Sequence, residues 1–181
     1  MRNLWKSVFG LWMIGLGLGG SVPAQATNAA GPYYATPSWD QTLPASTRFI
    51  VLTNMNSEAV LDRETGLVWE QSPSTSAIEW DFTLQHCVRL LKGGRKGWRL
   101  PTIQELESLV DPAVASPGPT LPFGHPFGNV QSSYYYSASS FVNGPDFAWG
   151  VSFSNGAVNG ISVIGANFGW CVRGGQGVDP Q

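Results

Sequence analysis

Five basic residues lie close together near the middle of the chain: Arg89, Lys92, Arg95, Lys96 and Arg99. A local group of guanidinium and ammonium groups can bind sulfate or phosphate even on an acidic protein. The ordinary alternative is a solvated helix end, because Arg89 and Lys92 fall in the last turn of a predicted helix, where positive charge suits the helix dipole. The sequence favours this alternative for the group, and the first four residues stay candidates for anion binding.

Aromatic residues offer a second route to a ligand. The C–H face of a pyranose packs against an aromatic ring, while its hydroxyls reach amide and carboxylate partners. Alternation along a strand predicts that about half of such rings face the core. Trp69 and Trp80 are assigned to the core. The candidate rings are Tyr134, Tyr135, Phe141, Trp149 and Trp170, with Asn143 and Asp146 as polar neighbours.

The stretch from Trp98 to Glu105 has the residue types of a structural corner. Pro101 biases the residue before it away from helical dihedrals, and Thr102 followed by Glu105 is the reciprocal arrangement that caps a helix N-terminus. The guanidinium of Arg99 can hold a carboxylate or several carbonyls at once. Because Arg99 lies just before the cap, we expect it to pair with Glu105 or with loop carbonyls and not with a ligand.

Catalytic and metal-binding patterns are absent from the sequence. It contains no G-x-S-x-G and no H-E-x-x-H, and His86 and His125 lack a third partner at recognisable spacing. It has no C-x-x-C, and its two cysteines and two histidines make a poor zinc set. The E-P-N, Q-P-D and W-N-D signatures of calcium-dependent sugar-binding lectins are also missing. We therefore expect no enzyme activity, no metal and no cofactor.

The N-terminal segment predicts export. Residues 1–26 carry Arg2 and Lys6, then an apolar stretch, then Ala24 and Ala26 in the A-x-A arrangement of a signal peptide. The apolar run is shorter than the about 20 residues that cross a bilayer, so we expect no transmembrane anchor. The protein should be periplasmic or extracellular. In that oxidising setting the only two cysteines, at positions 87 and 171, are expected to form a disulfide.

Removal of residues 1–26 leaves eight basic and twelve acidic residues, a formal net charge of −4. Such a balance argues against nucleic-acid binding over the whole surface. The remaining length suffices for one domain with a core. The sequence does not predict the oligomeric state.

Residues 27–47 are rich in small residues and proline and show no period, so we expect a linker or arm there and ordered structure from about position 48. Three short strands are expected at 48–52, 58–62 and 67–70, then a helix over 76–91 with Trp80, Leu84, Cys87 and Leu91 on one face. A second helix begins at the cap and ends near position 110. A proline-rich loop at 112–133 is the leading ligand-facing segment. Strands then follow at 134–141, 147–153, 157–163 and 168–174, with Asn155-Gly156 as a hairpin turn.

Several blocks together resemble one protein family. "DRETGLVWE", "GWRLPTIQELESLVD", "SFSNG" and "CVRGG", in this order, are similar to the Lcl C-terminal domain family of secreted or surface bacterial proteins. The resemblance implies an α+β, C-type-lectin-like fold near that of formylglycine-generating enzymes, with two short helices, a mainly antiparallel twisted sheet and long loops. The resemblance covers residues 48–175, which implies one domain over this range and a tail at 176–181. It also implies that Cys87 pairs with Cys171. Fold likeness does not imply the reaction of those enzymes.

These observations favour a secreted, non-catalytic binding or adhesion module that recognises a glycan, with a sulfated glycan as one form. Some lectin-like relatives are associated with sulfated polysaccharides, which supports a test of the basic group. The alternative is a structural or protein-binding module of the bacterial envelope, because lectin-like folds also present their loops to protein partners.

Overall fold

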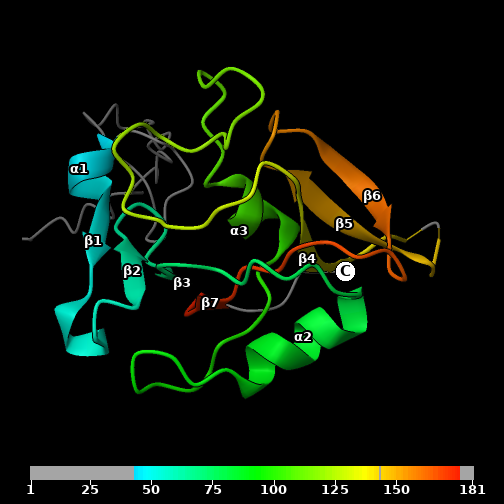
Figure 1. Cartoon of the computed structure of the whole chain (residues 1–181), viewed down its shortest axis with the longest axis horizontal. Coiled ribbons are helices and arrows are strands. Elements are labelled where there is room, and N and C mark those ends of the chain that lie inside the picture. Colours follow the sequence, from blue (N-terminus) through cyan, green and yellow to red (C-terminus); the bar gives the residue numbers. More distant parts are fainter. Residues whose placement is uncertain (1–42, 143, 176–181) are drawn as a thin grey trace, which may run out of the picture. The chain divides into compact units, whose positions relative to one another are not determined.

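The computed structural model describes residues 43–142 and 144–175 (Figure 1). The expected signal peptide, positions 27–42 of the expected arm, Asn143 and the 176–181 tail lie outside the described residues. The elements in chain order are α1 (Ala45–Arg48), β1 (Phe49–Val51), the 3-10 turn η1 (Thr53–Met55), β2 (Ala59–Asp62), β3 (Val68–Glu70), α2 (Trp80–Arg89), α3 (Ile103–Glu107), β4 (Tyr134–Ser140), β5 (Phe147–Ser152), β6 (Val158–Ser162) and β7 (Val172–Arg173).

The strands form two antiparallel sheets, which confirms the α+β class. One sheet has the order β1-β2-β3-β7 and the other the order β4-β5-β6. The mainly antiparallel pairing that the family resemblance implies is present, and it is divided between two sheets because the last strand pairs with β3 and not with β6. The segment before β7 first pairs through Phe168 with Tyr135 of β4, and then Val172 pairs with Trp69 of β3. One continuous segment thus joins the two sheets.

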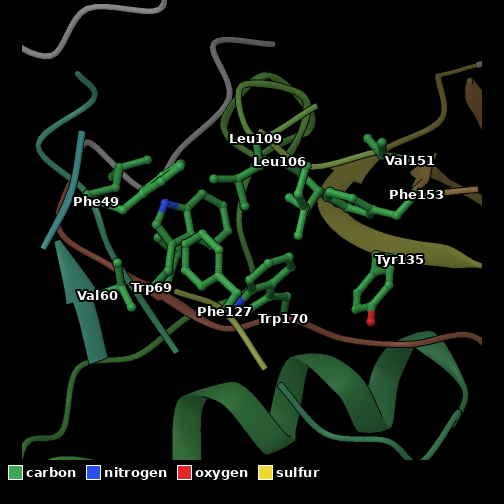
Figure 2. Packing of buried hydrophobic residues seen from close by; sticks show 13 residues of the cluster. Phe49, Val60, Trp69, Leu106, Leu109, Phe127, Tyr135, Val151, Phe153 and Trp170 are labelled. Carbon is green, nitrogen blue, oxygen red and sulfur yellow. The ribbon is translucent and has the colours of Figure 1, made fainter. Parts of the chain in front are cut away.

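Trp170, on that joining segment, is the centre of the main aromatic core (Figure 2). The centroid of its ring lies 4.9 Å from that of Phe127, 5.6 Å from that of Phe153 and 5.7 Å from that of Trp69. The contacts with Phe127 and Trp69 are edge to face, and the contact with Phe153 is tilted. Its indole Nε1 donates to the carbonyl of Glu70 at 2.9 Å. Buried aromatic pairs of this kind contribute beyond the area that they bury. Trp69 lies in the core as predicted.

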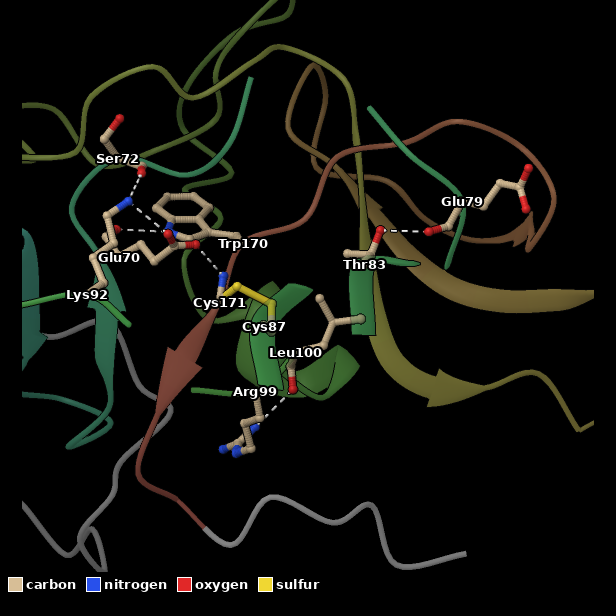
Figure 3. Close-up of a disulfide and its surroundings, with 10 residues drawn as sticks. All are labelled: Glu70, Ser72, Glu79, Thr83, Cys87, Lys92, Arg99, Leu100, Trp170 and Cys171. Carbon is tan, nitrogen blue, oxygen red and sulfur yellow. Dashed lines mark hydrogen bonds and ion pairs between the residues drawn. A yellow bond between two sulfur atoms is a disulfide. The ribbon is translucent and has the colours of Figure 1, made fainter. Parts of the chain in front are cut away.

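A second buried cluster contains the disulfide. Figure 3 shows this bond and its polar neighbours. Cys87 of α2 and Cys171 before β7 are bonded, with 5.4 Å between their Cα atoms, and both are fully buried. The predicted disulfide is therefore confirmed. The amide of Cys171 donates to Glu70 Oε2 at 2.9 Å, and Lys92 Nζ lies 2.9 Å from the other oxygen of this buried carboxylate.

Both helices are shorter than predicted. Helix α2 covers Trp80–Arg89, and Leu91, which was expected on its inner face, lies after the helix with 63% of its surface exposed. Trp80 is only partly buried; it packs against the second cluster and donates from Nε1 to the Ser137 carbonyl at 2.8 Å. Helix α3 has the predicted N-terminus but ends at Glu107.

The proline-rich loop 112–133 is anchored in the main core at several positions. Leu121 and Phe127 from this loop are buried in the main core. The Thr120 amide donates to the Phe153 carbonyl at 2.8 Å. The loop needs apolar anchors because its prolines remove the backbone donors that would otherwise pair it with a strand. The loop is therefore anchored in the core at these positions, and its role as a ligand-facing segment stays a prediction.

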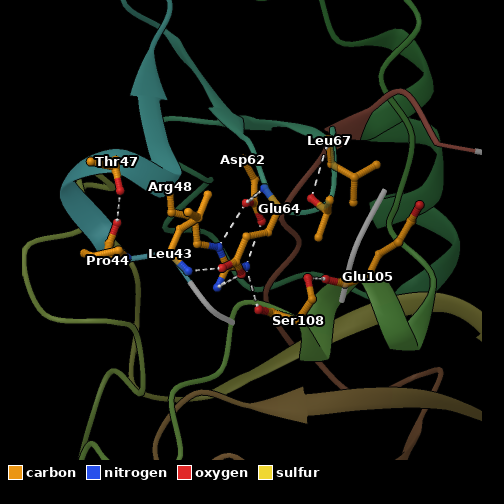
Figure 4. Close-up of polar contacts among 10 residues, drawn as sticks. Leu43, Pro44, Thr47, Arg48, Asp62, Glu64, Leu67, Glu105 and Ser108 are labelled. Atoms are coloured by element: carbon orange, nitrogen blue, oxygen red, sulfur yellow. Dashed lines mark hydrogen bonds and ion pairs between the residues drawn. The ribbon is translucent and has the colours of Figure 1, made fainter. Parts of the chain in front are cut away.

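A buried ionic cluster, which sequence periodicity did not predict, joins α1 to β2 and α3 (Figure 4). Arg48 is fully buried and donates to both oxygens of Asp62, at 2.9 and 2.7 Å, and to the Ser108 carbonyl at 2.8 Å. Glu64 lies 3.3 Å from the same guanidinium and accepts the amide of Leu43. Because a charge in the interior is tolerated only when paired, these contacts depend on each other.

Candidate functional site

The corner at residues 98–105 is structural, as the sequence predicted. Arg99 donates to Glu105 through both terminal nitrogens, at 2.6 and 2.5 Å, and to the Gly174 carbonyl at 2.6 Å. The same carboxylate accepts the amide of Thr102 at 2.8 Å, and the Thr102 hydroxyl accepts the Glu105 amide at 3.2 Å. The capping box is therefore complete. These internal contacts occupy the Arg99 guanidinium.

The candidate basic group divides into paired and unpaired cations. Lys92 lies beyond α2, so its predicted role at the helix dipole is wrong. Its ammonium instead pairs with buried Glu70 at 2.9 Å and donates to the Ser72 carbonyl at 2.8 Å. Arg89, Arg95 and Lys96 are exposed, and within the described residues their side chains make no ion pair or hydrogen bond. These three remain candidates for an external anion.

A tight turn holds two of these cations in place. Lys92 and Arg95 exchange two backbone hydrogen bonds, of 3.1 and 3.0 Å, around a Gly93-Gly94 turn in which both glycines have positive φ. The Gly93 position admits no side chain, because a Cβ there would lie 2.6 Å from Cβ of Met55. Trp98, which is buried, donates from Nε1 to the Arg95 carbonyl at 3.0 Å. The turn is thus anchored on its inner side, while Arg95 and Lys96 are exposed.

Arg173 also lies beside these cations, although it is 77 positions from Lys96 in the sequence and was not a candidate. Its Nε donates to the carbonyl of Lys96 at 2.8 Å. The contact places a fourth cation beside the turn, on β7, and joins the turn to the strand. We call Arg95, Lys96 and Arg173 the basic turn.

A cleft of about 430 Å³ runs along the outer face of α2. Its walls include Phe82 and Arg89, and the spacing of 82, 85, 86 and 89 puts these side chains on one face of the helix. Phe82 is 58% exposed, so its ring is accessible from solvent. We call this feature the α2 cleft; it is lined by Phe82, Gln85, His86, Arg89, Leu90 and Leu91. Of these residues the sequence singled out only Arg89 as a binding candidate, although an apolar ring at position 82, away from the predicted inner face, was a signal for the others.

Two of the aromatic candidates are wrong. Tyr135 and Trp170 are fully buried in the main core, so no ligand on the surface reaches them. Burial raises the pKa of Tyr135 to about 12, and its hydroxyl accepts the Gln131 amide at 2.8 Å, so it stays a neutral core residue. Tyr134 is half-buried, and its hydroxyl accepts a hydrogen bond from Asn159 at 3.0 Å.

The remaining aromatic candidates form a group elsewhere. Trp149 and Phe141 lie 4.7 Å apart between ring centroids, near exposed Asp146, and Phe147 joins them. Asn143 lies outside the described residues, and Tyr134 is on the opposite face of the sheet, because its register partner Ser152 is three residues from Trp149. The aromatic candidates that are not buried in the core therefore lie on two separate surfaces, Tyr134 on one and Phe141 with Trp149 on the other.

Among the described residues there is no group of three His, Cys, Asp or Glu side chains that could hold a metal ion. Burial lowers the pKa of His125, whose Nδ1 accepts the Phe127 amide at 3.1 Å, so this imidazole has a local role in the loop. In the same part of the chain, no helix has the length and apolar character needed to cross a bilayer.

Comparison with protein families gives a match to the model of the Lcl C-terminal domain over residues 58–173, more than half of the chain. The chain belongs to the Lcl C-terminal domain family. No curated protein matches the chain. The part of this Lcl C-terminal domain that the match covers contains both cysteines, the capped corner, the α2 cleft and the basic turn. The finer C-type-lectin-like assignment stays a prediction.

Proposed function

We propose that this Lcl C-terminal domain is an exported, non-catalytic binding or adhesion module that recognises an anionic glycan in the α2 cleft. The exported setting rests on the N-terminal segment, and its supports in the fold are the buried disulfide and the low share of charged residues. The absence of a catalytic motif from the sequence supports a binding function over an enzyme.

The observation that carries the proposal is Arg89. Its guanidinium is exposed and has no ion pair or hydrogen bond among the described residues, yet it forms part of the wall of a cleft. A planar guanidinium matches the oxygens of a sulfate or carboxylate in a bidentate manner. Phe82 offers a ring face for the C–H groups of the sugar. Gln85 and His86 add polar groups that can meet hydroxyls.

The surrounding charges support an anion over a neutral ligand at this cleft. The basic turn follows α2 by only a few residues, and two of its three cations lack internal partners within the described residues. Successive Cα atoms are about 3.8 Å apart, so position 92 lies within about 11 Å of Arg89. Arg95 of the basic turn lies directly opposite position 92, because the two residues exchange backbone hydrogen bonds. A chain of sulfated sugars that enters the cleft at Arg89 can therefore continue to the basic turn.

A protein ligand is the second candidate, and one observation favours it. The surface of α2 and its end exposes Phe82, Val88 and Leu91, more apolar area than a sugar site needs. Such a partner would bind mainly through apolar contacts, and added salt would weaken it little.

The experiment compares two charge reversals with the same change in net charge. Arg89→Glu alters the cleft, whereas Arg63→Glu alters an exposed arginine whose Nη1 donates to the Thr47 carbonyl, away from α2. The probe is a heparin-derived octasaccharide, measured by isothermal titration at about 50 and about 500 mM NaCl, a range over which the screening length falls several-fold.

The proposal predicts binding that weakens with salt, is reduced about tenfold or more by Arg89→Glu and changes little in Arg63→Glu. No binding at low salt, or equal binding by the two variants, would overturn it. Salt-independent capture of one envelope protein through Phe82 would favour the second candidate.

A further inference from the structure

Three aromatic rings form an open surface at one end of the β4-β5-β6 sheet, which we call the aromatic platform. It consists of Phe141, Phe147 and Trp149, on the gold strand β5 and the loop before it (Figure 1). Ring centroids of Phe141 and Trp149 are 4.7 Å apart, and those of Phe141 and Phe147 are 6.2 Å apart. Phe147 is 44% exposed, and the other two rings are partly exposed.

The platform follows from the pairing of β5. Phe147, Trp149 and Val151 alternate along the strand and share one face. Val151 is fully buried in the main core, whereas the other two lie at the open end of the same face. The opposite face is also packed, because Ala148 lies in the second cluster. The rings therefore cannot turn inward without displacing the core.

Glycine at position 160 lets the rings lie close to the strand. Gly160 of β6 is the register partner of Trp149, and a Cβ on it would lie 3.0 Å from the ring of Phe141. The missing side chain gives the Phe141 ring room against β6. Gly144 has the same relation to Phe147, with 3.1 Å from its virtual Cβ to that ring.

The charges around the platform favour a neutral ligand. Asp146, exposed and next to Phe147, is the only Asp, Glu, Lys or Arg between Asp111 and Arg173 in the sequence. The Asp146 carboxylate repels sulfate and carboxylate groups but accepts hydrogen bonds from hydroxyls. The platform thus has partly exposed rings beside a carboxylate acceptor, and no cation is near it in the sequence. Such a surface suits the C–H face of an uncharged sugar.

We propose that the aromatic platform is a second glycan-binding surface, which takes a neutral hexopyranose chain with one sugar ring on Trp149 and hydroxyls at Asp146. This surface goes beyond the proposed anion site and does not depend on it. The two differ in ligand charge, in the element that carries them and in their response to salt.

The test is isothermal titration of the full exported protein with four neutral hexaoses: cellohexaose, laminarihexaose, maltohexaose and chitohexaose. We expect at least one of them to bind, with the same affinity at about 50 and about 500 mM NaCl, because no ion pair is involved. Trp149→Ala and Phe147→Ser should each weaken that binding about tenfold or more. Two controls should leave it unchanged: Phe123→Ser, since Phe123 is an exposed ring of another loop, and Arg89→Glu.

The outcomes separate the two proposals. Hexaose binding that survives Arg89→Glu but fails in Phe147→Ser supports the platform whether or not the heparin octasaccharide binds. The platform proposal is overturned if none of the four hexaoses binds, or if both ring variants bind as well as the parent protein. It is also overturned if the protein self-associates and Phe147→Ser abolishes this, since a second copy would then cover the rings. Phe147 is the decisive position because its exposed ring can be replaced without opening the core.

Discussion

The Cys87–Cys171 disulfide should supply a large part of the stability of the domain. The bond closes a loop between residues 84 positions apart, for which the chain-entropy model gives a stabilisation of about 4.6 kcal/mol at 25 °C. Single domains of this kind have total stabilities of about 5–15 kcal/mol. We therefore expect the double substitution Cys87→Ala/Cys171→Ala to lower the free energy of unfolding by about 3–5 kcal/mol.

Urea unfolding followed by tryptophan fluorescence measures this change, since Trp69, Trp98 and Trp170 are buried reporters. The unfolding free energy should also fall more steeply with urea concentration in the variant. An unfolded chain without the crosslink is more expanded and exposes more surface, which raises this slope. Hydrogen exchange should show the largest loss of protection in α2. This helix begins at Trp80, which is held by the Ser137 carbonyl, and its later turns are joined covalently to the β7 segment through Cys87.

A decrease of less than about 1 kcal/mol in the unfolding free energy would refute this reasoning. The entropy of closing the loop would then be cancelled by strain in the folded state or by residual structure in the unfolded chain. An unchanged slope together with a lower midpoint would point instead to lost packing around the sulfurs. The octasaccharide affinity should fall in the variant as well, since the α2 cleft depends on the position of this helix.

Three further substitutions test other parts of the structure. Arg48→Met should lower the free energy of unfolding by about 3–5 kcal/mol in a urea titration, because it leaves the buried Asp62 and Glu64 carboxylates without their cation; a loss below 1 kcal/mol would contradict it. Glu105→Gln should lower the free energy of unfolding by about 1–3 kcal/mol, since Arg99 and the helix cap lose a shared acceptor. Glu107→Gln, on the exposed side of α3, should change this free energy little. His125→Asn should flatten the dependence of stability on pH below about 6.5: burial lowers the pKa of folded His125, so the unfolded state binds more protons there and acid destabilises the parent protein. Equal slopes for both proteins in unfolding experiments between pH 7 and 5 would refute this assignment.

Local patterns in the sequence predicted the elements that depend on neighbouring residues. The Thr102–Glu105 cap, the Asn155-Gly156 turn and the strands on either side of it all appear where the residue types indicate them. The disulfide was also predictable, because a chain whose N-terminal segment predicts export has only two cysteines, which allow one pairing. Helix ends were less predictable, since Leu91 continues the apolar period of α2 but lies beyond its last turn.

Features that depend on distant parts of the chain were not predictable from periodicity. Arg48 and Ser108 are 60 positions apart, and the contact of Arg173 with Lys96 spans 77. Alternation correctly predicted that some candidate rings would be buried, but it did not distinguish Tyr135 from its neighbour Tyr134. This choice depends on which face of β4 meets the main core, and that face is set by the pairing with β5.

Backbone amide chemical shifts during titration with the heparin-derived octasaccharide test the central claim most directly. If the α2 cleft holds the anionic glycan, the largest shift changes should fall on residues 82–91, extend to 95, 96 and 173, and disappear in Arg89→Glu but persist in Arg63→Glu. Changes confined to other surfaces, or changes along α2 that survive the loss of Arg89, would contradict the account.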